Sequence, residues 1–338
     1  MIIIRADANE QIGTGHVMRC LSVAKAFALR GIEALFVTAD EKGNALIEQN
    51  GFHSVCLNSV WTDLEAELPA LQFVINKYQP SFLLIDSYFV TQNYFQVLSK
   101  LVKTAYIDDM NKERWDVDAI INYNIFASVF NYSWYNTTRT KLIIHPRFAP
   151  LREEFKNCPE HTINTYVKDI IVSAGGADPE HITKKILKKI CSVTPDIRFH
   201  FVVGALNPRL EEIKSLASEN FNAVLHINES HMSDLMKKCD IAISAAGTTL
   251  YELCACGIPT ITYTLADNQL VAAEQFEAQG VMISAGDCRG DDEFIERVET
   301  NLTQLAAKVD LRRELSQKMQ ALVDGNGSER LVEELLLM

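Results

Sequence analysis

The stretch Gln11-Ile12-Gly13-Thr14-Gly15-His16-Val17-Met18-Arg19-Cys20 joins two segments with different apolar patterns. Before it, the apolar run Ile2-Ile3-Ile4 predicts a buried strand; after it, the apolar spacing from Val17 to Leu29 predicts a helix. Gly13 and Gly15 allow a tight turn and a close approach of a ligand to the backbone. The unpaired amides at the start of the helix suit a phosphate or an anionic leaving group. The chain therefore begins as strand, glycine loop and helix, with a candidate anion site at the loop.

His16 lies at the start of this predicted helix. Histidine is the side chain that most easily accepts a proton near neutral pH, so His16 is a candidate catalytic base. The alternative is a tight strand-to-helix turn that carries a histidine, because a short glycine motif is a weak signal by itself. Both interpretations are open at this point.

The composition of the 338-residue chain is typical of a globular protein long enough for two domains, with 48% hydrophobic and 22% charged residues. The formal net charge is -12 and no lysine- or arginine-rich block is present, which argues against nucleic-acid binding. No apolar run is long enough to span a bilayer, and no charged leader precedes an apolar core. We therefore expect neither a membrane partner nor a signal peptide.

The eight cysteines are scattered, without a Cys-x-x-Cys pair or a metal-ligand spacing with histidine. This distribution favours a reducing compartment, so we expect a cytoplasmic protein that binds no metal. Cys254 and Cys256 are close in sequence, but their small, apolar neighbours predict packing residues. We also expect a monomer that needs no cofactor.

Polar residues recur directly after the strands predicted in the first half of the chain. In an open parallel sheet, ligands bind outside the carboxyl ends of the strands. The residues expected to line one cleft with His16 on this ground are Asp86, Tyr88, Asp108, Asp109, Asn122 and Asn124. For each of them, capping a helix or forming a turn is the competing explanation. Asp108-Asp109 is not expected to bind a metal, because adjacent residues at one strand end point in opposite directions.

A second series of strands and helices follows a predicted hinge at Phe148 to Tyr166, which lacks sustained periodicity. We expect an α/β protein whose two parallel-sheet domains, residues 1–150 and 165–338, face a cleft and are joined by a linker at 151–164. A strand predicted at Asp169–Ser173 precedes a second glycine loop, which contains Gly175 and Gly176.

The stretch from Ser244 to Glu252 predicts a nucleotide site in the second half. Its small residues, among them Gly247, allow a diphosphate to approach the backbone, and Thr248 and Thr249 add hydroxyl donors at a helix start. Glu252, one turn into that helix, is placed to accept hydrogen bonds from both hydroxyls of a ribose. The competing explanation for Glu252 is a charge that favours the helix N-terminus. The polar pair Asn268-Gln269 follows another strand and adds to the candidate site.

Together these residues resemble a known superfamily. The motifs Gly-Thr-Gly-His at 13–16, Ser-Ala-Ala-Gly-Thr-Thr-Leu-Tyr-Glu at 244–252 and Ala-Asp-Asn-Gln at 266–269 are similar to those of glycosyltransferase-B proteins, which have two Rossmann-like domains. Within it, the chain most resembles the pseudaminic acid pathway hydrolases of UDP-2,4-diacetamido-2,4,6-trideoxy-β-L-altropyranose, relatives of the MurG-like transferases. The stretches that carry this closer resemblance are Arg5-Ala6-Asp7, Ile85-Asp86-Ser87-Tyr88, Arg152-Glu153-Glu154-Phe155 and Ser173-Ala174-Gly175-Gly176-Ala177-Asp178.

The resemblance implies a reaction and a set of site residues. It implies hydrolysis of the UDP-sugar to UDP and free sugar by attack of water at the anomeric carbon, with His16 as the base. It further implies that Tyr88 and Asn268 contact the sugar and that Glu252 holds the uridine ribose. The remaining substrate-binding candidates are Gly13, Gly15, Gly175, Gly176, Gly247, Thr248, Thr249 and Gln269.

Two alternatives remain beside hydrolysis. One is a MurG-like transferase that uses the same donor, and the other is a non-catalytic protein that binds a nucleotide sugar. The acidic residues Asp63, Glu65 and Glu67 stand where MurG-like enzymes have a basic and apolar patch for lipid, which favours the hydrolase. In the superfamily the last helix often returns to the first domain, and Leu331 to Leu337 is placed to do so.

Overall fold

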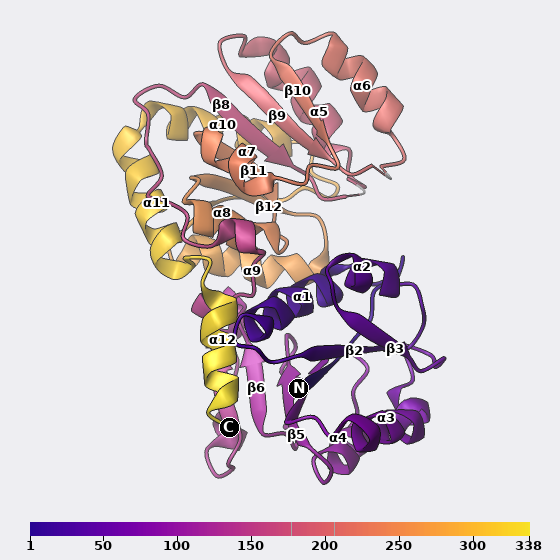
Figure 1. Ribbon diagram of the computed structural model, residues 1–338. Helices are drawn as coiled ribbons and strands as arrows, with labels where there is room; N and C mark the ends of the chain where they lie inside the picture. Colours follow the sequence, from indigo (N-terminus) through magenta and orange to yellow (C-terminus); the bar gives the residue numbers. More distant parts are fainter. Residues whose placement is uncertain (177, 206) are drawn as a thin grey trace. The chain divides into compact units, whose positions relative to one another are not determined.

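The computed structural model of the chain describes residues 1–176, 178–205 and 207–338, so Ala177 of the second glycine loop lies outside the described residues. The chain forms two compact units. Unit 1 comprises Met1–Glu153 and Asn326–Met338, and unit 2 comprises Glu154–Gly325. Each unit has a parallel sheet with its own helices (Figure 1).

Unit 1 contains a seven-stranded sheet in the order β3-β2-β1-β4-β5-β6-β7, with parallel pairing throughout. Short apolar runs form the central strands because both faces of the sheet are covered by helices or loops. The strands are β1 (Ile2–Ala6), β2 (Ala34–Thr38), β3 (His53–Cys56), β4 (Phe82–Asp86), β5 (Lys103–Ile107), β6 (Ala119–Asn122) and β7 (Lys141–Ile144).

The helices of unit 1 begin and end where local sequence signals favour it. Helix α3 (Leu64–Tyr78) begins after Asp63, whose carboxylate accepts a hydrogen bond from the Ala66 amide at 3.2 Å. It ends at Gln79, which has a left-handed backbone conformation. The helices are α1 (Gly15–Ala28), α2 (Asn44–Gln49), α3 (Leu64–Tyr78), α4 (Gln92–Leu98) and α12 (Gly327–Leu336). Single turns of 3-10 helix lie at η1 (Ile125–Val129), η2 (Ser133–Tyr135), η3 (Pro146–Phe148) and η4 (Glu153–Phe155).

Unit 2 contains a six-stranded parallel sheet in the order β10-β9-β8-β11-β12-β13. Its strands are β8 (Asp169–Ser173), β9 (Arg198–Val203), β10 (Ala223–Ile227), β11 (Ile241–Ala245), β12 (Thr260–Thr264) and β13 (Ile283–Asp287). Its helices are α5 (Ile182–Lys189), the 3-10 turn η5 (Cys191–Val193), α6 (Leu210–Ser218), α7 (Met232–Lys238), α8 (Thr249–Cys256), α9 (Asp267–Ala278), α10 (Phe294–Ala307) and α11 (Val309–Leu322).

The strand order reverses once in each sheet, and the reversal positions the candidate loops. In unit 1 it lies between β1 and β4, and in unit 2 between β8 and β11. In open α/β sheets, ligands bind outside the carboxyl ends of the strands at such a point. The loops that follow β1 and β4, and those that follow β8 and β11, are the glycine loops and polar strand ends identified in the sequence.

The end of the chain departs from the expected division. Residues 326–338 were expected in the second domain, but the structure groups them with unit 1, where α12 packs against α1 (Figure 1). The helix buries Leu331, Val332 and Leu335. The period of these residues indicates an apolar face, but it does not say which domain covers that face. The structure places the segment as the resemblance implied for Leu331 to Leu337, with the first domain.

Two glycines accompany this return of the chain. A Cβ on Gly327 would lie 2.1 Å from the Ala149 carbonyl oxygen, and one on Gly325 would lie 1.9 Å from that of Phe155. Real side chains do not tolerate such distances, so the backbone of the returning segment passes close to the segment where the chain first leaves unit 1 only because both residues are glycine.

Candidate active site

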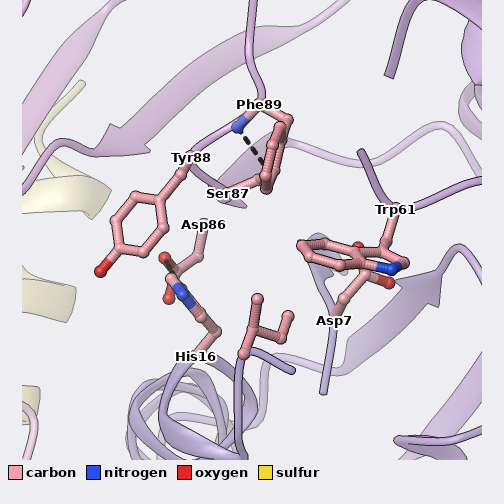
Figure 2. A pocket seen from close by; sticks show the side chains of 8 residues that line it. Asp7, His16, Trp61, Asp86, Ser87, Tyr88 and Phe89 are labelled. Atoms are coloured by element: carbon pink, nitrogen blue, oxygen red, sulfur yellow. Dashed lines mark hydrogen bonds and ion pairs between the residues drawn. The ribbon is translucent and has the colours of Figure 1, made fainter. Parts of the chain in front are cut away.

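A hollow opens in unit 1 at the carboxyl ends of β1 and β4. Figure 2 shows Trp61 on one side of it, across from His16, Asp86 and Tyr88. The hollow combines acidic and imidazole groups with three aromatic rings. The residues that line it are Asp7, Ile12, His16, Trp61, Asp86, Ser87, Tyr88 and Phe89.

His16 and Asp86 form a buried pair in this hollow. His16 lies in the first turn of α1 and Asp86 is the last residue of β4, so the neighbouring strands β1 and β4 bring them together. The distance from His16 Nδ1 to Asp86 Oδ1 is 2.6 Å, and the side chains are 8% and 0% exposed. A contact this short between buried groups is a charge-assisted hydrogen bond.

Arg19 pairs with both oxygens of the Asp86 carboxylate. Its Nε donates to Oδ2 and its Nη2 donates to Oδ1, each at 2.5 Å, a bidentate pairing. Its Nη1 donates to Asp109 Oδ2 at 2.7 Å and to the Tyr123 hydroxyl at 2.8 Å. Arg19 is therefore clamped between the carboxyl ends of β4, β5 and β6, and it locks the orientation of the Asp86 side chain.

The ionisation of Asp86 determines which nitrogen of His16 carries the proton. Burial alone would raise the pKa of Asp86, but the Arg19 guanidinium and His16 outweigh it and hold that pKa well below its ordinary value. An ionised carboxylate can only accept, so His16 Nδ1 donates to it. In the neutral imidazole, Nε2 then carries the lone pair, which is the arrangement a general base requires.

Tyr88 joins the same group of side chains. Its ring meets the His16 ring edge-on, with centroids 4.7 Å apart, and its hydroxyl donates to Asp109 Oδ2 at 3.2 Å. Burial and the Asp109 charge raise the pKa of Tyr88, so the phenol stays protonated and acts as a donor. Asn124 Nδ2 donates to the other Asp109 oxygen at 2.8 Å. Asp109 is thus shared by Arg19, Tyr88 and Asn124.

The polar residues after the strands divide into two groups. Asp86, Tyr88, Asp109 and Asn124 belong to the network around His16 and Arg19. Asp108 instead accepts from the amides of Met110 and Asn111 in a turn and from the Trp115 indole. Asn122 Oδ1 accepts from both the backbone amide and the side-chain Nδ2 of Asn124, each at 3.0 Å. Of the six residues expected to line one cleft, Asp86 and Tyr88 line the hollow with His16, whereas Asp109, Asn122 and Asn124 belong to the hydrogen bonds around it. The expectation was wrong for Asp108, because adjacent residues at a strand end point to opposite faces.

The wall opposite His16 is aromatic. The rings of Trp61 and Phe89 meet edge-on with centroids 5.1 Å apart (Figure 2). Below them, Asp7 accepts from the Ala39 amide at 2.7 Å and from Arg5 at 2.6 Å. Arg5 is fully buried, so Asp7 is rigidly held at the end of β1.

Sequence reasoning did not single out Arg19, Trp61 or Phe89. The spacing of three residues between His16 and Arg19 on one helix was the available signal, because residues i and i+3 share a helix face. No signal connected Trp61 to the site, because it lies in the loop between β3 and α3 and reaches the hollow only through the fold.

In unit 2 the predicted site residues follow three neighbouring strands. Gly175, with φ of 75°, and Gly176 follow β8, and Gly247 and Thr248 follow β11. Thr249 begins α8 and Glu252 lies in its first turn. Asp178, at the end of the first loop, accepts from the amides of Ile182 and Thr183 at 2.7 and 3.0 Å, so its carboxylate caps α5.

Asn268 and Gln269 lie in the first turn of α9, after β12. Asn268 is exposed. Gln269 Oε1 accepts from the Leu265 amide at 3.0 Å, so this side chain holds the loop that enters the helix. Because β8, β11 and β12 are consecutive in the sheet, all three loops lie along one edge of unit 2.

Two further features are absent from residues 1–176, 178–205 and 207–338. These residues contain no cluster of three or more His, Cys, Asp or Glu side chains arranged to hold a metal ion. Within the same ranges, no helix has the length and apolar character needed to cross a bilayer.

No protein-family model matches the chain, but several proteins are similar to it in sequence. The spore coat polysaccharide biosynthesis protein SpsG of Bacillus subtilis is 25% identical over 343 residues, 97% of this chain and 95% of the relative. A UDP-2,4-diacetamido-2,4,6-trideoxy-β-L-altropyranose hydrolase of Campylobacter jejuni is 25% identical over 256 residues, 74% of this chain and 86% of the relative.

The third is a Helicobacter pylori protein named as a pseudaminic acid cytidylyltransferase and a hydrolase of the same UDP-sugar. It is 24% identical over 287 residues, 82% of this chain and 47% of the relative. The chain spans a similar share, 54%, of an uncharacterized Methanocaldococcus jannaschii protein that is 26% identical. It therefore spans about half the length of these two relatives.

Solved structures with the same architecture include MurG of Acinetobacter baumannii, with a TM-score of 0.70 and 13% identity over 100% of this chain and 99% of that one. UDP-GlcNAc 2-epimerase of Neisseria meningitidis, bound to UDP-GlcNAc, matches with a TM-score of 0.69 and 15% identity over 100% of both chains. The chain therefore has the glycosyltransferase-B fold and, as its motifs predicted, resembles in sequence enzymes named as hydrolases of a UDP-diacetamido sugar.

Proposed function

We propose that the protein hydrolyses a UDP-linked 2,4-diacetamido-2,4,6-trideoxy hexose to UDP and the free sugar. The observation that carries the proposal is the buried His16–Asp86 pair, 2.6 Å apart, at the hollow of unit 1. The names of the Campylobacter jejuni and Helicobacter pylori relatives support this choice of substrate and reaction.

In the proposed reaction, His16 Nε2 removes a proton from a water molecule whose oxygen attacks the anomeric carbon of the sugar. The bond between that carbon and the diphosphate oxygen breaks, and UDP leaves with the electron pair. A nucleoside diphosphate is already a stable anion, so one base suffices and no acid is needed at the leaving oxygen. Attack from the face opposite the leaving group inverts the anomeric centre.

The charges around His16 favour this role. Two carboxylates, Asp86 and Asp109, surround one guanidinium, Arg19, so the cluster carries a negative charge while His16 is neutral. When His16 takes the proton, the cluster becomes balanced. The developing imidazolium is therefore stabilised by groups that are already in place and need no reorganisation. Asp86 acts as a positioning residue, since it touches His16 and not the reacting atoms.

The wall of the hollow supports a sugar with apolar substituents. Trp61, Phe89 and Tyr88 present aromatic surface, while Asp7 and Ser87 present polar groups. N-acetyl methyl groups and a 6-deoxy carbon bury favourably against aromatic rings. The proposal assigns the sugar to unit 1 and the UDP moiety to the loops of unit 2 that contain Gly175, Gly176, Gly247, Thr248, Thr249 and Glu252, with Asn268 and Gln269 beside them.

The test is incubation with UDP-2,4-diacetamido-2,4,6-trideoxy-β-L-altropyranose and no acceptor, in heavy-oxygen water. We expect UDP and free sugar, with the label in the sugar, and a rate that rises with pH as one base loses its proton. The variant His16→Asn keeps a group able to hydrogen-bond Asp86 but lacks a basic nitrogen. It should bind substrate normally and lose about 10²- to 10⁴-fold in turnover.

Four outcomes would contradict the proposal. Label in UDP would mean attack at phosphorus, and turnover only with an added acceptor would indicate a transferase. Tight binding of the UDP-sugar without any turnover would indicate a binding protein. Near-normal turnover by His16→Asn would leave the loop at 13–16 as an anion-binding turn only.

A further inference from the structure

Two cysteines far apart in sequence meet in unit 2. Cys158 Sγ and Cys256 Sγ are 3.8 Å apart, although 98 positions separate them along the chain. Cys158 lies in the segment that leads into the sheet of unit 2, and Cys256 is the last residue of α8. Cys158 is partly exposed, whereas Cys256 is buried.

The segment that carries Cys158 is anchored on both sides of it. Before it, Glu154 accepts from the Ser233 amide at the start of α7 at 3.0 Å. After it, the Pro159 carbonyl accepts from Gln320 Nε2 at 2.9 Å, and the same Gln320 nitrogen contacts the Ala255 carbonyl, next to Cys256, at 3.3 Å. These bonds hold the segment against α8 and keep the two sulfur atoms together.

The two thiols differ in character in a way that suits a reaction between them. Their shared hydrogen bond lowers the pKa of Cys158, with a smaller contribution from the Lys237 charge. The same bond, together with burial, raises the pKa of Cys256. Cys158 is therefore the thiolate-forming, solvent-accessible partner, and Cys256 retains its proton inside the protein.

We propose that Cys158 and Cys256 form a reversible dithiol–disulfide pair that responds to peroxide. The Cys158 thiolate attacks one peroxide oxygen, the O–O bond breaks, and Cys158 becomes a sulfenic acid as hydroxide leaves. Cys256 sulfur then attacks the Cys158 sulfur, the S–O bond breaks, and the departing hydroxide leaves as water with the Cys256 proton. One peroxide thus accepts two electrons from two thiols and yields one disulfide and two waters. The sulfurs must approach from 3.8 Å to about 2.0 Å, the length of a disulfide bond.

The test uses the reduced full-length protein, treated with hydrogen peroxide at neutral pH and then denatured and alkylated. Non-reducing peptide mass spectrometry should find the Cys158 and Cys256 peptides joined, with the link reversed by dithiothreitol. The matched control is Cys56→Ser, because Cys56 is the other partly exposed cysteine and its thiol is bonded to the oxygen atoms of Ala39 and Asn58 at 3.6 Å. This control should form the link as the wild type does, whereas Cys158→Ser should not.

A second variant keeps the test decisive. Cys256→Ala leaves Cys158 without a resolving partner, so its sulfenic acid should persist and be trapped by dimedone, which should label the wild type far less. Peroxide treatment that takes Cys158 to a sulfinic acid while Cys256 stays free to alkylate would overturn the proposal, as would a link between other cysteines. The inference does not depend on the proposed hydrolase activity.

Discussion

At the scale of single residues, one carboxylate connects most of the candidate active site. Asp86 accepts from His16, from two nitrogens of Arg19 and from the Cys20 thiol at 3.6 Å. A group with so many donors stays ionised even when buried, because each donor stabilises its charged form. Its ionised state keeps the proton of His16 on Nδ1, so the basic nitrogen faces away from Asp86.

Asp86→Asn should therefore lower turnover by about 10²- to 10⁴-fold while substrate affinity changes little. The amide that replaces the carboxylate can donate to His16 Nδ1, which shifts the proton to Nε2 and removes the basic lone pair. Steady-state kinetics of UDP release measures the effect. The double variant His16→Asn/Asp86→Asn should lose no more than His16→Asn alone, because the two residues act as one unit. Multiplicative losses would show that Asp86 acts independently of His16.

A second residue-scale feature is a pair of histidines on the sheet of unit 2. His200 on β9 and His226 on β10 approach to 3.0 Å between Nδ1 and Nε2. Asp169 Oδ1 lies 2.9 Å from His200 Nε2, and Glu229 Oε2 lies 3.4 Å from His226 Nδ1. Burial and then the neighbouring His200 lower the pKa of His226 below its ordinary 6.5. The folded state thus disfavours the proton that the unfolded chain accepts.

The sign of the pH effect follows from this difference. Below about pH 6.5 the unfolded chain binds a proton at His226 that the folded protein resists, so stability falls as the pH drops from 6.5 toward the lowered pKa. Urea unfolding followed by circular dichroism at pH 7.5 and 5.5 measures the loss. His226→Gln should reduce the difference between the two pH values. If the free energy of unfolding changed equally between the two pH values in variant and wild type, His226 would not be the cause.

At the scale of elements, the C-terminal helix α12 is a structural part of unit 1. Its Leu331 is fully buried, whereas Leu337, just past its end, is 78% exposed. Arg30 of unit 1 also pairs with Glu333 at 2.7 Å, but an exposed pair of this kind contributes little. The apolar face of α12 therefore accounts for most of the stabilisation that the helix supplies.

Leu331→Ala should destabilise unit 1 by about 2–5 kcal/mol, because it removes a fully buried side chain and leaves a cavity. The matched control Leu337→Ala should change stability by less than about 0.5 kcal/mol. The three tryptophans, Trp61, Trp115 and Trp134, all lie in unit 1, so tryptophan fluorescence during urea unfolding reports this unit. Equal midpoints for the two variants would contradict the packing of α12 on unit 1.

At the scale of the whole molecule, the two units have separate hydrophobic cores. Our proposal assigns UDP to unit 2, so UDP alone should protect backbone amides within Glu154–Gly325 from hydrogen exchange. A ligand at 100 times its dissociation constant stabilises the form that binds it by about 2.7 kcal/mol. Protection confined to unit 1 would place the nucleotide elsewhere.

Glu252→Ala should weaken this protection. Loss of a charged hydrogen bond to the ribose costs about 1.5–3 kcal/mol, which corresponds to roughly ten- to a hundredfold weaker UDP binding in calorimetry. Glu299→Ala on α10, an exposed glutamate, is the matched control and should bind UDP normally. Unchanged affinity in Glu252→Ala would remove that residue from the site.

The sequence by itself determined the alternating architecture and the loops of interest. Apolar runs such as Phe82–Ile85 and the helical spacing after Gly15 are local signals, and they predicted β4 and α1 closely. The position of His16 and the glycine loops followed from the same local patterns. Such signals suffice because a strand or helix is decided mainly by residues close in sequence, through the side-chain period and the backbone limits of glycine.

Only the tertiary structure decided which distant residues meet. His16 and Asp86 are 70 positions apart, and their contact depends on β1 and β4 being neighbours in the sheet. The entry of Trp61 into the hollow has the same origin. The physical reason is that periodicity shows which face of an element is buried but not what covers it. The covering partner is chosen by strand order and by packing over the whole fold.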